Sequence, residues 1–166
     1  MPREEQGVTS DRFSVIPRTL IFVTRGSQVL LLKGAPHKRL WANRYNGIGG
    51  HVERGEGIES SARRELLEET GLRVVDLWLC AVAMIDAGAS TGICNFIFRA
   101  DYQAGALCRG GEGGLERVEQ SRIAEYPLVE DLYLILPRLL DRKRGDPLLS
   151  FRYWYDAENH LQVEPG

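Results

Sequence analysis

The strongest local pattern in the chain is GHVERGEGIESSARRELLEETGL, residues 50–72. Its second half, over 58–70, is rich in residues that favour a helix. Gly71 follows at the position where a glycine commonly ends a helix, because glycine adopts the left-handed backbone without strain. We therefore expect a loop, a helix over 58–70 and a closing turn.

Three carboxylates share one face of this expected helix. At about 100° per residue, Glu65, Glu68 and Glu69 fall within an arc of roughly 100°. Carboxylates at this spacing repel one another unless a cation lies between them, and hard oxygen ligands on one short surface are what Mg²⁺ or Mn²⁺ prefers. The segment 50–72 also holds six glutamates against three arginines, a local balance of −3. We expect a Mg²⁺ site here, with Mn²⁺ able to replace it.

The spacing of the fixed residues points to a known family. Gly50 is followed six residues later by Glu56, and then by Arg64–Glu65 and Glu68–Glu69. The segment matches GX5EX7REUXEEXGU, with U apolar, and so resembles the signature of the Nudix hydrolases at every position. The resemblance implies a Nudix α/β/α sandwich with a mixed sheet, in which the loop–helix–loop of 50–72 is the catalytic element.

The same resemblance implies a role for each matching residue. Glu65, Glu68 and Glu69 would bind metal through their carboxylates, and Gly50 through its carbonyl oxygen. Arg64 and Glu56 would hold helix and loop together by an ion pair. The general base stays open among Glu69, Glu68 and Glu112, because sequence does not distinguish groups that share a metal.

The resemblance extends to the MutT-type and oxidised-purine nucleoside triphosphate pyrophosphohydrolases. Asn46, in YNGIGG, matches a residue that contacts the purine, or else it serves as an Asn-Gly turn residue. In the loop GGEGGLERV, Glu112 matches a further metal ligand, with Glu116 and Glu119 as competitors. In YPLVEDLYLILPRLL, Glu130 and Asp131 match acids that bond the base, but the tryptophan that precedes those acids is absent, which leaves stacking to Tyr45 or Trp41. We therefore expect substrate contacts at Asn46, Tyr45, Glu130 and Asp131.

Hydrophobic patterning outlines the rest of the chain. Residues 1–16 are polar and are expected to form a loose lead-in, and 34–50 a long structured loop with one short strand. Apolar or β-branched runs predict strands over 18–24, 29–33, 72–85, 92–102, 150–156 and 160–163. A glycine-rich loop over 108–118 is expected to lead into a further short strand. A helical stripe predicts a second helix over 129–143, with a kink or break at Pro137. The order predicts a mixed-sheet α/β or α+β domain spanning 1–166.

Composition excludes several classes of protein. The chain has 166 residues, one domain's worth, and no apolar run approaches the length of a membrane span. Its net charge of −2 argues against a partner that is a nucleic-acid polymer. Cys80, Cys94 and Cys108 are an odd number without CxxC spacing, so we expect a reducing, cytoplasmic home. A small-molecule nucleotide is the expected partner, and the protein is expected to be a monomer or homodimer.

The function implied is Mg²⁺-dependent hydrolysis of a nucleoside diphosphate linked to another moiety. The foremost substrate is a nucleoside triphosphate, of the oxidised-purine (8-oxo-dGTP) type, cleaved to monophosphate and pyrophosphate. ADP-ribose, dinucleoside polyphosphates and NADH stay open, because the motif specifies the diphosphate chemistry and not the attached group. Two alternatives of other classes are an isoprenoid diphosphate isomerase and a non-catalytic nucleotide-sensing module on the same fold.

Overall fold

A computed structural model describes residues 2–9, 11–102, 107 and 113–166. Within them the strands are β1 (Ser14–Arg25), β2 (Gln28–Gly34), β3 (Tyr45–Asn46), β4 (Leu77–Ile85), β5 (Thr91–Asp101), β6 (Gly113–Glu119), β7 (Leu149–Tyr155) and β8 (Leu161–Pro165). The helices are α1 (Ile58–Thr70) and α2 (Leu132–Asp141), with 3₁₀ turns η1 (Arg3–Gln6) and η2 (Gln120–Glu125). No helix in this described part is both long and apolar enough to cross a membrane.

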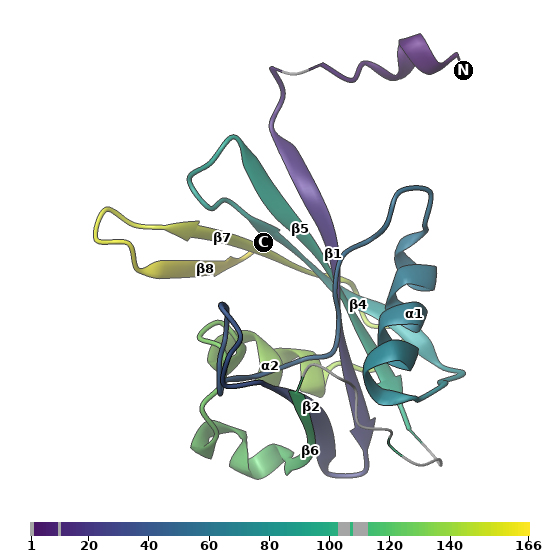
Figure 1. Ribbon diagram of the computed structural model, residues 1–166, viewed down its shortest axis with the longest axis vertical. Coiled ribbons are helices and arrows are strands. Elements are labelled where there is room, and N and C mark those ends of the chain that lie inside the picture. The colour runs from purple at the N-terminus through teal and green to yellow at the C-terminus, as the bar shows by residue number, and fades with distance from the viewer. Residues whose placement is uncertain (1, 10, 103–106, 108–112) are drawn as a thin grey trace.

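The strands form one mixed sheet in the order β3-β2-β1-β5-β4-β7-β8, and β6 pairs with β2 (Figure 1). The pairs β1–β5 and β4–β7 are parallel, and the other pairs are antiparallel. The β1–β5 pairing runs from Ser14 opposite Thr91 to Thr24 opposite Asp101. The β1–β5 pair therefore lies at the centre of the sheet, with β2 and β3 on one side of it and β4, β7 and β8 on the other.

Strand β1 contributes to the cores on both faces of the sheet. Successive side chains of a strand point to opposite faces. Leu20 and Phe22 belong to the core that contains α2, whereas Ile21 and Val23 belong to the core that contains α1. The two helices thus cover opposite faces of the sheet, which confirms the predicted α/β/α arrangement with a mixed sheet.

Helix α1 has the predicted bounds because both of its ends are specified locally. At the start, the N–H of Gly57 donates to Ser60 Oγ (3.1 Å). At the end, Gly71 has φ 73° and its N–H donates to the carbonyl of Leu67 (2.8 Å). Leu66 is fully buried against the sheet, so the opposite side of the helix remains for charged residues.

Other boundaries differ from the predictions. The strand expected over 72–85 begins at Leu77, because Arg63 donates to the carbonyl of Val74 (2.7 Å) and ties that segment to α1. The helix expected over 129–143 is confined to 132–141 and continues through Pro137. Strand β1 begins at Ser14, inside the expected lead-in, and η2 has no counterpart among the predicted elements.

Candidate active site

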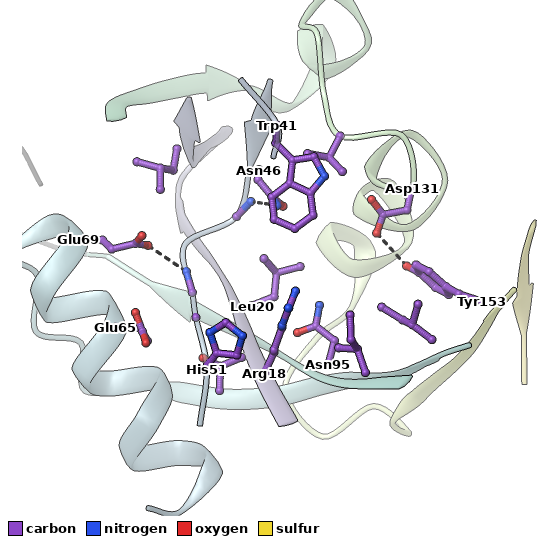
Figure 2. Close-up of a pocket in the computed structure, with 18 of the residues that line it drawn as sticks. Arg18, Leu20, Trp41, Asn46, His51, Glu65, Glu69, Asn95, Asp131 and Tyr153 are labelled. Atoms are coloured by element: carbon purple, nitrogen blue, oxygen red, sulfur yellow. Dashed lines mark hydrogen bonds between the residues drawn. The ribbon is translucent and has the colours of Figure 1, made fainter. Parts of the chain in front are cut away.

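A cavity of about 660 Å³ opens between α1, the central strands and β7 (Figure 2). One end is lined by Glu65, Glu68 and Glu69 of α1. The other end is lined by Asp131 and Tyr153. The cavity therefore joins an acidic helix face to a second polar region that lies far away in the sequence.

Two glycines bring the backbone of the preceding loop against α1. Gly49 has φ 154°, and a Cβ there would collide with the carbonyl oxygen of Thr19. A Cβ at Gly50 would collide with the carboxylate of Glu65. This close approach lets the Gly49 N–H donate to Glu69 Oε2 (3.0 Å). The loop thus positions one carboxylate of the helix directly.

A bidentate ion pair, here called the brace, joins Glu56 in the loop to Arg64 on α1. Arg64 Nε lies 3.0 Å from Glu56 Oε1, and Nη2 lies 3.0 Å from Oε2. Arg64 Nη2 also donates to the carbonyl of His51 (3.0 Å). The hydrogen bonds from Arg64 are the main reason that the pKa of Glu56 falls to about 2. The brace therefore stays ionised at neutral pH and fixes the loop to the helix.

The carboxylates of α1 carry the chemistry of a divalent-cation site. Among the described residues, no three histidine, cysteine or acidic side chains converge closely enough to hold a metal ion. Instead, Arg64 Nη1 pairs with Glu65 (2.8 Å) and with Glu68 (3.2 Å). The carbonyl of Gly50 accepts from Thr19 N–H (2.9 Å), which leaves it a second lone pair. These carboxylates and the Gly50 carbonyl are hard oxygen donors of the kind that divalent cations such as Mg²⁺ prefer.

The opposite end of the cavity presents hydrogen-bonding groups. Asn46 Oδ1 accepts from the N–H of Gly47 (2.8 Å), so its amide is oriented by its own turn. Asp131 Oδ2 accepts from the hydroxyl of Tyr153 (3.1 Å). Burial raises the pKa of Asp131, although the Tyr153 hydrogen bond works in the opposite direction. This end can therefore offer both donors and acceptors to a ligand.

The family of the chain follows from comparison with known proteins. A family model described as a NUDIX domain matches residues 15–101, a range that includes the whole of the 50–72 motif. The chain belongs to the Nudix family. It is 35% identical over 127 residues to an oxidized purine nucleoside triphosphate hydrolase of Danio rerio, which covers 76% of this chain and 80% of that protein. The chain is thus a Nudix hydrolase, which disfavours the isomerase and sensor alternatives.

Solved structures of Nudix proteins share the fold. A MutT protein of Bacillus halodurans superposes with a TM-score of 0.72 at 25% identity, over 90% of this chain and 97% of that one. The NUDIX domain of Shewanella oneidensis NrtR, solved with ADP ribose, gives a TM-score of 0.66 at 15% identity, over 84% and 97% of the two chains. At that identity the second likeness concerns the fold alone.

Two of the predicted substrate contacts lie outside the Nudix cavity. Tyr45 is buried in the α2 core, where it packs edge-on against Tyr126 (centroids 5.2 Å apart) and its hydroxyl bonds to Glu116. Tyr45 and Asn46 are neighbours on a strand, so only one of them can face the cavity. Glu130 is exposed and does not line the cavity, unlike Asp131. Of the four residues expected to contact substrate, Asn46 and Asp131 line the cavity, whereas Tyr45 and Glu130 do not.

The predicted further carboxylate, Glu112, lies outside the described residues. Its two competitors are engaged elsewhere. Glu116 accepts from Tyr45, and Glu119 accepts from Ser27 Oγ (2.7 Å) and Gln28 Nε2 (2.6 Å). Neither of the two lines the cavity, so both are removed from the set of expected metal ligands.

Several cavity residues were not among the predicted site residues. They are Arg18, His51, Glu53 and Asn95, together with Trp41, which was considered only for stacking. Arg18 and Asn95 are paired across β1 and β5, and no local pattern in the sequence indicates this register. His51 and Glu53 occupy variable positions within the Nudix motif, so their closeness to Gly50 in the sequence was the only available signal.

Proposed function

We propose that this Nudix hydrolase cleaves nucleoside triphosphates that carry an oxidised purine, of the 8-oxo-dGTP type, to the monophosphate and pyrophosphate. One observation carries the proposal: the acidic face of α1 and the polar pair Asn46–Asp131 open onto the same cavity. Its volume lies within the range of about 300–1,000 Å³ for small-molecule sites. The name of the Danio rerio relative supports the choice of substrate.

The acidic end would hold Mg²⁺, with Mn²⁺ as a substitute, through Glu65, Glu68, Glu69 and the Gly50 carbonyl, with Glu112 as the expected further ligand. When bound, the metal neutralises phosphate charge and lowers the pKa of water. The protein's own part is positional. The brace holds the loop beside α1, and the N–H of Gly49 orients Glu69. A carboxylate of this group, Glu69, Glu68 or Glu112, would accept the proton of the attacking water.

The polar end would bind the base. Asn46 carries both a carbonyl and an NH₂ group. Asp131 offers an acceptor when ionised and a donor when protonated, and burial raises its pKa. A site that hydrogen-bonds a base discriminates because the wrong base leaves its buried polar groups unpaired. The proposal keeps a small nucleotide as the partner, a monomer or homodimer, and a cytoplasmic setting, in which the buried thiols of Cys80 and Cys94 are free.

A product-resolved comparison with Mg²⁺ tests this function. The substrates are 8-oxo-dGTP, dGTP, dCTP and ADP-ribose, and kcat/KM is measured for the wild type and for Glu69→Gln. We expect 8-oxo-dGTP to give the highest value and the variant to lose activity on every substrate. If ADP-ribose or dCTP exceeded the purines by tenfold, about 1.4 kcal/mol in transition-state binding, the purine proposal would be wrong.

A further inference from the structure

Two polar side chains on the floor of the cavity have no partner of their own. Arg18 of β1 and Asn95 of β5 are opposite each other in the parallel pairing, and both line the cavity. Arg18 Nε and Asn95 Oδ1 are shielded from solvent, and neither makes a hydrogen bond to any described residue. Leaving such atoms unpaired is unfavourable, because they have lost their hydrogen bonds to water. A ligand that pairs with them would recover this cost.

Arg99, a buried arginine on β5, shows what a structural role looks like in this sheet, although its Nε, like that of Arg18, has no hydrogen-bond partner among the described residues. Its Nη1 donates to the carbonyls of Leu139 (3.1 Å), Leu140 (2.9 Å) and Arg142 (2.6 Å) and so caps the end of α2. Within the described chain, the guanidinium of Arg18 has no hydrogen bond or ion pair comparable to these. Arg99 lines none of the cavity, whereas Arg18 does. Arg18 is therefore placed to bind a ligand rather than to hold the fold.

The pair lies on a different side of the cavity from the other polar contacts. Figure 2 shows Arg18 and Asn95 on the sheet floor, Asn46 and Trp41 across from them, and Asp131 beyond. A flat base bound between these groups would present one edge to Asn46 and Asp131 and another to Arg18 and Asn95. The floor pair and the Asn46–Asp131 pair would then contact different edges of the same ring.

The chemistry of the two floor side chains determines which edge fits. Arg18 can only donate, and Asn95 Oδ1 can only accept. The carboxyl oxygens of Asp131 suit the N1–H and NH₂ donors of guanine and the NH₂ of Asn46 suits the O6 acceptor beside them, so the floor pair faces the N7/C8 edge. With Asn95 opposite N7 and Arg18 opposite C8, guanine would place its N7 acceptor against the Asn95 Oδ1 acceptor and its C8–H against Arg18, so neither group would be paired. An 8-oxopurine has an N7–H donor for Asn95 and an O8 acceptor for Arg18.

We propose that Arg18 and Asn95 are specificity-determining residues that hydrogen-bond the N7/C8 edge of the base and select 8-oxopurine nucleotides over unoxidised ones. This inference rests on the proposed function, because it assumes that a purine nucleotide occupies the cavity. The diphosphate chemistry at α1 does not depend on it.

The test compares Arg18→Met and Asn95→Leu, which keep the approximate size of each side chain and remove its polar atoms. The measurement is kcat/KM with Mg²⁺ for 8-oxo-dGTP, dGTP, 8-oxo-dATP and dATP. We expect each variant to lower both ratios of oxidised to unoxidised substrate by about tenfold. The oxidised adenine is included because it shares the N7–H and O8 atoms and differs at the opposite edge.

Controls separate selection from folding. Arg138→Met removes an arginine from the exposed side of α2 and should leave both ratios unchanged. Because Arg18 Nε is unpaired in the free protein, Arg18→Met should keep or raise the melting temperature, whereas loss of a structural contact would lower it. Arg18→Lys retains the charge and one donor, and should fall between wild type and Arg18→Met in its ratios.

The remaining outcomes distinguish failure of this inference from failure of the proposed function. If the wild type prefers oxidised purines and both variants keep that preference, the inference is wrong and the proposed function stands. Equal losses on all four nucleotides would also overturn it, because the pair would then contact the shared sugar or phosphates. If the wild type shows no preference for oxidised purines, the proposed substrate fails, and this inference fails with it.

Discussion

At the scale of single residues, the glutamates of α1 fall into two groups according to the side of the helix that they occupy. Glu65, Glu68 and Glu69 line the cavity. Glu59, on the same helix, pairs with Arg63 (2.8 Å) on the exposed side. A substitution of Glu to Gln keeps the shape of each side chain and removes its charge, so this chain contains a matched control for its own site.

We expect Glu69→Gln and Glu68→Gln each to reduce turnover by several orders of magnitude, because each removes an anionic ligand from the metal site. The melting temperature of the metal-free protein should stay the same or rise, since like charges on one helix face repel. Glu59→Gln should retain full activity. Steady-state hydrolysis at saturating Mg²⁺ and a thermal melt measure both effects, and normal turnover in both active-site variants would exclude the metal site on α1.

At the scale of elements, the brace makes the loop and α1 one unit. Glu56 is 17% exposed, and its partner Arg64 also contacts Glu65 and Glu68. A change in the loop is therefore transmitted to two cavity carboxylates. The consequence of losing Glu56 should be seen in both stability and activity.

The depressed pKa of Glu56 predicts a pH dependence of stability. Its pKa falls from an ordinary value of 4.5 to about 2 in the folded protein. The stabilisation from the brace is thus fully present above pH 4.5 and is lost as the pH falls through about 2. We expect Glu56→Gln to be less stable than wild type at pH 7, with a difference that shrinks on acidification. Urea titrations from pH 7 to 3 measure this, and a constant difference across that range would contradict the assignment.

The elements also show what the sequence could and could not predict. The bounds of α1 were predicted correctly because the signals are local: helix-forming residues and Gly71. The Glu56–Arg64 pair was implied by the resemblance to the Nudix signature, and the structure contains it. Tyr45 was misplaced because a two-residue strand is too short to show which face each side chain takes. The Arg18–Asn95 pair was missed because the two residues are 77 positions apart, and no repeating pattern in the sequence shows which residues of two parallel strands lie opposite each other.

At the scale of the whole molecule, β1 connects the two cores. Its alternate side chains enter both, so neither helix can leave the sheet without exposing part of this strand. We propose that the chain is one cooperative domain, as its length also suggests.

Leu66→Ala on α1 and Leu136→Ala on α2 test that cooperativity. Both side chains are fully buried, one in each core, so each truncation should cost about 2–5 kcal/mol. In each variant, far-UV circular dichroism and tryptophan fluorescence should report the same urea midpoint. Separate midpoints for the two probes would show that the cores unfold independently.

The parallel pairing of β1 with β5 has a consequence for how new activities arise in this protein. Along β1 and β5, side chains that face the cavity alternate with side chains that pack in the core on the other face of the sheet. Positions 18 and 95 can therefore change while the packing beneath α1 is preserved. The hydrolytic machinery lies on a helix that these positions do not belong to. If positions 18 and 95 contact the base as proposed, mutation at two sites distant in the gene would redirect the enzyme to another nucleobase in small steps, and a combinatorial library at these two codons would be a compact starting point for directed evolution.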